Sequence, residues 1–180
     1  MKKVAKRQSD RLKEALAEME EQISIKMLRV VSGEFTGFYE NGIWENRVII
    51  PAAFRELIKP HAKKTVYVAF GPDGSVGIYP LDSWVLLKNK RKEDPQRANK
   101  FLTILERYAM PPQVLEGPGR IRIRDDLLKR ANITDKLIIA GNNHYMSLWN
   151  PERYQEIKEL QTQEFDNENG QDYFNQPDLS

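Results

Sequence analysis

An internal repeat constrains the fold of this chain more than any other feature of its sequence. The segment NRVIIPAAFREL (46–57) aligns with GRIRIRDDLLKR (119–130), and the segment at 66–84 aligns with that at 136–154, in the same order. Two related segments in one order indicate two copies of a single supersecondary unit. A unit of a few short strands cannot bury both of its faces alone, so we expect the copies to share one hydrophobic core.

Each copy shows the same series of elements. A short extended stretch leads through a turn into a second strand, a short helix follows, and a strand pair joined by a tight turn precedes a final helix. Strands are expected at 34–39, 47–50, 66–70 and 76–79 in the first copy and at 113–115, 120–124, 137–140 and 146–149 in the second. Apolar residues at helical spacing predict a further helix over 95–108. The predicted class is α+β, with two β-α-β-β units.

These elements divide the chain into five parts. We expect an N-terminal helical extension (1–32), a first unit (33–92), a linking helix (93–111), a second unit (112–161) and an acidic disordered tail (162–180). The extension is amphipathic, which predicts that its apolar stripe packs either on the body of the protein or on a neighbouring subunit. The tail is polar and carries carboxylates without a basic residue, a composition typical of disorder.

Arginine alternates with isoleucine in GPGRIRIRDD (117–126). Alternate side chains of a strand point to opposite faces, so Arg120, Arg122 and Arg124 are expected on one face and the isoleucines in the core. A row of one charge repels itself unless a polyanion or carboxylates lie beside it. Two interpretations remain open: guanidinium groups free for phosphates and guanine edges, or ion pairs with the acidic tail or the two following aspartates. The first aspartate, Asp125, is also expected to cap the next helix.

Composition excludes several classes of protein. The chain has no cysteine, which excludes disulfides and thiolate metal sites. Its apolar runs are far shorter than the roughly 20 residues that span a bilayer, and no signal peptide is evident, so we expect a soluble intracellular protein. The two histidines, His61 and His144, lie in predicted loops without metal-site spacing or a nucleophile motif. We therefore expect neither catalysis nor a metal or cofactor.

The motifs of the repeat resemble one known family. They are GEF (33–35), IPAAFR (50–55) and IYPLDSW (78–84) in the first half, and LWNPERY (148–154) in the second. In this order they are similar to the MraZ family of bacterial transcription regulators, and the similarity covers about 33–160. The resemblance implies two tandem SpoVT/AbrB-type units, whose swapped-hairpin halves share a small β-barrel core with flanking helices. It also implies ring-shaped homo-oligomers.

The resemblance also implies which residues meet DNA. Each half of the family carries an Asp-x-x-Gly-Arg motif, and its arginine falls on Arg47 in the first half and Arg120 in the second. The second half keeps a carboxylate and the glycine, whereas the first half holds Ile43, Glu45 and Asn46 at the motif positions, and its turn is longer than the family's usual turn. The family motif thus predicts DNA binding by Arg47, Glu116, Gly119 and Arg120, and the alternating strand adds Arg122 and Arg124, which replace residues usually apolar or proline in the family.

The function that follows is sequence-specific DNA-binding regulation of transcription. The expected partners are double-stranded promoter repeats of the division and cell-wall gene cluster and further copies of the chain, with no membrane and no small-molecule ligand. The expected location is the cytoplasm, in association with the nucleoid. The altered first-half motif keeps an alternative open, namely a ring-forming protein-interaction scaffold with weakened DNA binding.

Overall fold

The computed structural model describes residues 13–14, 16–19, 31–93 and 95–169. Residues 13–14 and 16–19 belong to the expected N-terminal helix and are helical. One of them, Met19, packs against the main hydrophobic core. The rest of that extension up to residue 30, and the end of the expected tail from residue 170, lie outside the described residues.

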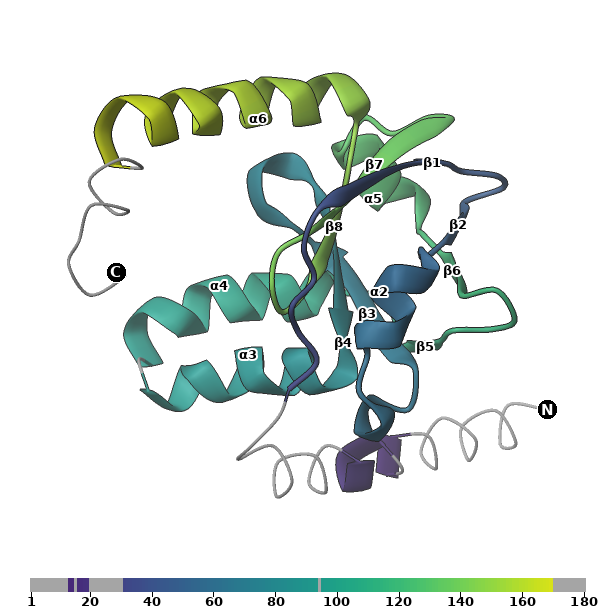
Figure 1. The fold of residues 1–180 in the computed structure, drawn as a ribbon. Coiled ribbons are helices and arrows are strands. Elements are labelled where there is room, and N and C mark those ends of the chain that lie inside the picture. Colours follow the sequence, from purple (N-terminus) through teal and green to yellow (C-terminus); the bar gives the residue numbers. More distant parts are fainter. Residues whose placement is uncertain (1–12, 15, 20–30, 94, 170–180) are drawn as a thin grey trace, which may run out of the picture.

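Six antiparallel strands form one sheet in the middle of the molecule (Figure 1). In spatial order they are β1 (Phe38–Gly42), β7 (Lys136–Gly141), β8 (Met146–Trp149), β4 (Val76–Pro80), β3 (Thr65–Phe70) and β5 (Gln113–Val114). The halves are interleaved, because β1 of the first repeat pairs with β7 of the second and β5 of the second pairs with β3 of the first. Each half therefore needs the other to complete its sheet.

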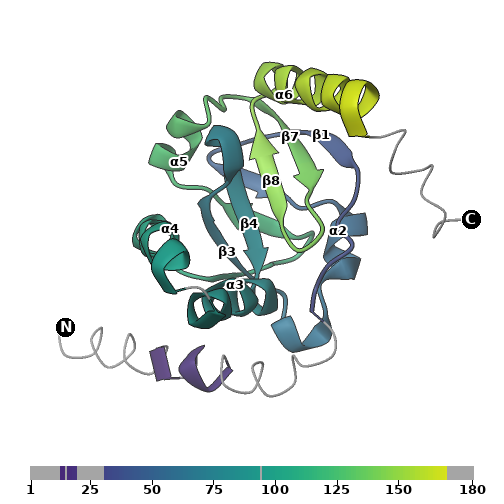
Figure 2. The ribbon, with the colours of Figure 1, turned by 90° about the vertical axis from the view of Figure 1, so that its left-hand side faces the viewer.

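Helices cover this sheet (Figures 1 and 2). They are α2 (Ala52–Leu57), α3 (Leu81–Glu93), α4 (Pro95–Tyr108), α5 (Asp125–Arg130) and α6 (Pro151–Glu164), with short helical turns at Pro60–Ala62 and Pro72–Gly74. α3 and α4 lie side by side, and Trp84 of α3 stacks on Tyr67 of β3 with 4.6 Å between ring centroids. Leu102 and Leu105 of α4 complete that apolar cluster. The helix expected over 95–108 is thus present with the same bounds.

A second, two-stranded antiparallel ribbon takes one strand from each half. It consists of β2 (Arg47–Ile49) and β6 (Arg120–Arg122), and β1 lies against β2. Figure 1 shows this ribbon at the side of the molecule away from α3 and α4. Each ribbon strand leads directly into a short helix, β2 into α2 and β6 toward α5.

The main core mixes residues of both halves. Its largest fully buried side chains include Phe54 and Ile50 from the first half and Ile123 and Leu127 from the second. The ring of Phe35 meets Phe54 edge to face at 5.8 Å, a favoured geometry for aromatic pairs. The prediction of the α+β class is confirmed. Within the described ranges, every helix is too short or too polar to cross a bilayer.

The structure differs from the sequence-based expectation at two helix ends. Arg124 is the N-cap residue of α5, no side chain caps its amides, and Asp125 instead contacts the side-chain amide of Asn46. The helix at the start of the expected tail also continues, because α6 reaches Glu164 and a π-helical turn follows at Phe165–Asn169. The hydroxyl of Thr162, which donates to the Lys158 carbonyl at 2.7 Å, lies within this helical stretch.

Candidate nucleic-acid interface

The β2–β6 ribbon has one buried face and one exposed face. Val48 and Ile121 lie opposite each other in the register, and both are buried in the core. The period of two along each strand turns the flanking residues outward. The exposed face therefore carries the other two cross-strand pairs, Arg47 opposite Arg122 and Ile49 opposite Arg120.

The two turns that lead into the ribbon differ in shape. In the first half, Trp44 and Arg47 exchange backbone hydrogen bonds of 3.1 and 2.8 Å around Glu45 and Asn46, which have positive φ of 47° and 62°. This is the φ pattern of a tight hairpin turn. The strand before this turn, β1, has five residues, whereas β5 before the second turn has two. The side chain of Trp44 is 77% exposed beside Arg47.

The second turn runs from Glu116 to Arg120. The carbonyl of Glu116 accepts hydrogen bonds from the backbone N–H groups of Gly119 at 2.9 Å and Arg120 at 3.1 Å. Gly117 and Gly119 adopt positive φ of 48° and 89°, which glycine reaches without strain. Glu116 thus meets Arg120 through its backbone in the described structure.

The exposed ribbon face concentrates positive charge. Arg47 and Arg122 are directly opposite across the strands, and like charges in that arrangement repel. Within the described ranges neither Arg120 nor Arg122 makes an ion pair, and Arg47 has an exposed contact with Glu45 at 3.4 Å. An exposed pair of this kind stabilises a protein little. A bound anion would therefore relieve the repulsion.

The third arginine of the expected row is exposed but has partners of its own. The strand ends at Arg122, and Arg124 donates hydrogen bonds to the Asp126 carboxylate at 2.9 Å and to the Tyr108 carbonyl at 3.0 Å. The hydrogen bond from Arg124 holds the pKa of Asp126 below its usual value. Of the two interpretations that the sequence leaves open for the row, the ion pair holds for Arg124.

Gln113, which the sequence patterns did not single out, holds the outer edge of β6. Its side-chain amide accepts from the Arg122 N–H and donates to the Arg122 carbonyl, both at 2.8 Å. This double contact stands in for a neighbouring strand and fixes the backbone of Arg122. An open groove of about 370 Å³ adjoins it, lined by Arg47, Pro112, Gln113, Val114, Glu116, Arg120, Ile121 and Arg122. The fold therefore brings four of the six predicted site residues together here.

Arg55 of α2 supports the second turn. A side chain on Gly119 would overlap the Cδ of Arg55, so glycine is what lets the turn and the helix pack closely. The Nε of Arg55 is buried without a hydrogen-bond partner in the described part of the chain. The sequence places Arg55 in the IPAAFR motif but does not show that it packs on the other half of the protein.

Replacing Gly119 by alanine should lower the free energy of unfolding by about 2 kcal/mol, because strain at positive φ adds to the overlap with Arg55. Gly117→Ala is the matched control. It has positive φ but open space around the added carbon, so a cost of about 1 kcal/mol is expected. Urea denaturation measures both. Equal costs would show that the close packing on Arg55 contributes nothing.

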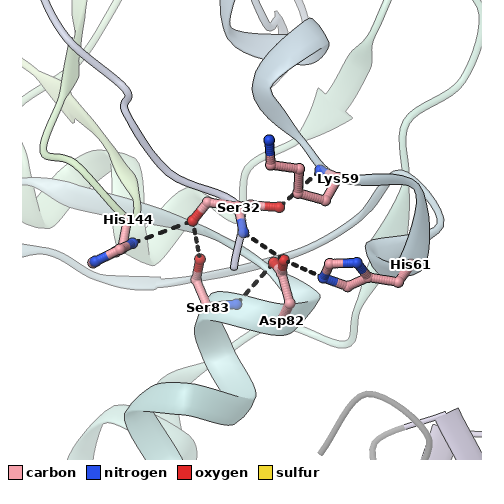
Figure 3. A network of polar contacts seen from close by, with 6 residues as sticks. All are labelled: Ser32, Lys59, His61, Asp82, Ser83 and His144. Atoms are coloured by element: carbon pink, nitrogen blue, oxygen red, sulfur yellow. Dashed lines mark hydrogen bonds and ion pairs between the residues drawn. The ribbon is translucent and has the colours of Figure 1, made fainter. Parts of the chain in front are cut away.

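A second polar cluster lies where the chain enters the described body at residue 31 (Figure 3). The buried Asp82 carboxylate accepts the Ser32 N–H at 2.6 Å and contacts His61 Nε2 at 2.8 Å. The Ser32 hydroxyl accepts from the Lys59 N–H at 2.9 Å, and the Ser32 carbonyl lies 3.3 Å from His144 Nδ1. No described contact joins the Ser32 hydroxyl to His61, so the cluster lacks the hydrogen bond that activates a serine nucleophile. Its geometry fits a structural clasp.

Several known proteins are similar to this chain in sequence. No family model matches the chain. A protein of Limosilactobacillus reuteri named Transcriptional regulator MraZ is 31% identical over 140 residues, which cover 76% of this chain and 93% of the relative. The chain belongs to the MraZ family. Members from Clostridium acetobutylicum and Clostridium tetani are 30% and 29% identical over 129 residues, covering 69% of this chain and 87% of each relative.

Membership of the MraZ family agrees with the resemblance read from the repeat motifs. The matches at these identities cover most of each relative, so both halves of the chain take part in the likeness. The family name does not by itself assign a role to any side chain. That assignment rests on the ribbon, where the arginines of the two halves meet on one face.

Proposed function

We propose that this chain is a sequence-specific DNA-binding regulator of transcription. The observation that carries the proposal is the exposed ribbon face, on which Arg47, Arg120 and Arg122 gather from both halves of the chain. The major groove of B-DNA admits a two-stranded β-ribbon, and arginine binds phosphates and guanine edges with paired hydrogen bonds. The relatives named as transcriptional regulators support the same function.

The proposal assigns different parts to the predicted site residues. Arg120 and Arg122 grip DNA from the second half, and Arg47 does so from the first half beside its weak contact with Glu45. Gly119 lets the backbone of the turn approach a phosphate, and Glu116 shapes that turn through its carbonyl. Arg124 joins the interface only when it leaves Asp126.

The finer architecture belongs to the same proposal. The exchange of β1 and β5 between the halves supports two swapped-hairpin units of the SpoVT/AbrB type around one barrel-like core. We propose ring-shaped homo-oligomers in the cytoplasm, associated with the nucleoid. Several ribbons on one ring would bind several promoter repeats at once and gain affinity by multivalency.

Binding to two duplexes tests the function. One carries the promoter of the division and cell-wall gene cluster in the source genome, and the other carries the same bases in scrambled order. Fluorescence anisotropy at physiological salt should show at least a tenfold preference for the promoter, because each mismatched base pair costs about 1–3 kcal/mol. Light scattering of the same samples should show a defined oligomer.

Equal affinity for the two duplexes would favour the alternative, a ring-forming scaffold with weakened DNA binding. The alternative is favoured by the partners of two interface cations: Arg124 is hydrogen-bonded to Asp126, and Glu45 lies 3.4 Å from Arg47. If the protein were a monomer that still preferred the promoter, the proposed ring would be refuted, whereas the proposed DNA-binding function would stand.

A further inference from the structure

The two strands of the ribbon are related by a local twofold axis, but their side chains differ at one pair of related positions. In the repeat, Arg47 corresponds to Arg120 and Ile49 corresponds to Arg122. The register obeys the same relation, because Arg47 lies opposite Arg122 and Ile49 lies opposite Arg120 around the central pair of β2 and β6. One end of the exposed face therefore carries two guanidinium groups, and the other end carries one guanidinium and one isoleucine.

Ile49 is the residue that makes the two ends chemically different. Its side chain is 42% exposed although it lies between arginines on a charged face. A single exposed isoleucine is ordinary on a protein surface. Its position is what matters here, because an apolar side chain gains nothing from a phosphate, whereas the arginine at the equivalent place binds phosphates and guanine.

The base edges of the major groove offer one apolar group, the C5-methyl of thymine. Side chains two residues apart on a strand are about 7 Å apart, close to two base-pair steps of roughly 3.4 Å. A ribbon in the groove would thus set Ile49 about two steps from Arg47. The minor groove, about 6 Å wide, is too narrow for two strands.

Resting on the DNA-binding function proposed above, we propose that Ile49 contacts a thymine methyl and so gives the ribbon a fixed orientation on its site. The twofold-related position, Arg122, contacts a guanine edge or a phosphate instead. The site read by one ribbon is therefore not a palindrome. Its thymine lies at the Ile49 end, and its other end faces the pair Arg47 and Arg122.

The test removes single methyl groups from DNA. A duplex is first selected from a random library with the full-length protein, and each thymine is then replaced by uracil, which differs only in the methyl. At one position in each ribbon site, uracil should weaken wild-type binding roughly fourfold, the effect of burying about one methyl. Ile49→Ala should bind both duplexes equally, whereas Ile104→Ala, which removes an exposed isoleucine from α4, should keep the difference.

A charge-neutral exchange tests the orientation. The double variant Ile49→Arg with Arg122→Ile keeps the composition of the ribbon and moves the isoleucine to the twofold-related place. The uracil-sensitive position should then move to the opposite end of the site. Because the chain has no cysteine, a single Lys129→Cys change on the exposed part of α5, outside the groove, can carry a DNA-cleaving tag that marks which end faces the second half.

The outcomes separate this inference from the function on which it rests. A selection that yields no preferred sequence would refute the DNA-binding function and the inference together. A preferred sequence with uracil effects that are absent, or equal in the wild type and Ile49→Ala, would refute the inference and leave the function standing. A uracil-sensitive position that stays in place in the double variant would also overturn the assignment to Ile49.

Discussion

Replacing Asp82 by alanine will lower the free energy of unfolding by about 3 kcal/mol, because a buried carboxylate with several partners leaves them all unpaired when it is removed. The carboxylate accepts backbone N–H groups of Ser32 at 2.6 Å and Ser83 at 2.9 Å, and it contacts His61 at 2.8 Å. Both N–H groups belong to buried residues, so water replaces the lost acceptor poorly. The clasp in Figure 3 thus ties residue 32 to the start of α3.

Urea denaturation at one protein concentration measures this loss, since oligomerisation makes apparent stability depend on concentration. Glu156→Ala is the matched control. Glu156 is exposed and pairs with Arg153 on the surface of α6 at 3.0 Å, so its removal should change the free energy of unfolding by less than about 0.5 kcal/mol. Similar losses for the two variants would show that the buried clasp does not stabilise the body.

The sequence repeat predicts the fold well because the pattern of each strand and helix occurs in both copies. The strand, helix and hairpin signals agree between the copies, and α4 has the bounds that its apolar spacing indicates. No local pattern in the sequence predicts that β1 and β5 are exchanged between the halves. Strand partners are chosen by contacts distant in sequence, and two similar units offer each strand two similar partners.

The exposure of the candidate site residues could be predicted where arginine and isoleucine alternate along a strand. Arg120 and Arg122 are exposed, and Ile121 between them is buried, because β6 keeps a period of two. The rule also holds for Ile123, which is buried, and for Arg124, which is exposed, but Arg124 is hydrogen-bonded to Asp126. Alternation states which face a residue takes, but it does not state which partner its side chain meets.

The sequence did not show which partners several of these residues meet. Gln113 fixes the edge of β6 from β5, and Arg55 packs against Gly119 from the other half of the chain. His61 and Asp82 meet although loops and strands separate them along the chain. The contacts of Arg55 and His61 depend on segments far apart in the sequence coming together.

The loss of two ribbon arginines should have the largest effect on DNA binding. Arg120 and Arg122 make no ion pair among the described residues, so Arg120→Ala with Arg122→Ala removes two charges without exposing a buried partner. Each phosphate contact contributes about −0.9 to the slope of log affinity against log salt. The double variant should therefore have a slope shallower by about two for each bound ribbon. Affinity at low salt should fall roughly a hundredfold if each contact is a charge-assisted hydrogen bond.

The most direct test is the salt dependence of binding to the promoter duplex for the wild type, this double variant and a control. Arg153→Ala with Lys158→Ala removes the same charge from α6, which Figure 1 shows apart from the ribbon. A ribbon that binds DNA predicts a steep slope for the wild type and the control and a flattened slope for Arg120→Ala with Arg122→Ala. The same slope in all three proteins, with weak binding that ignores sequence, would contradict it.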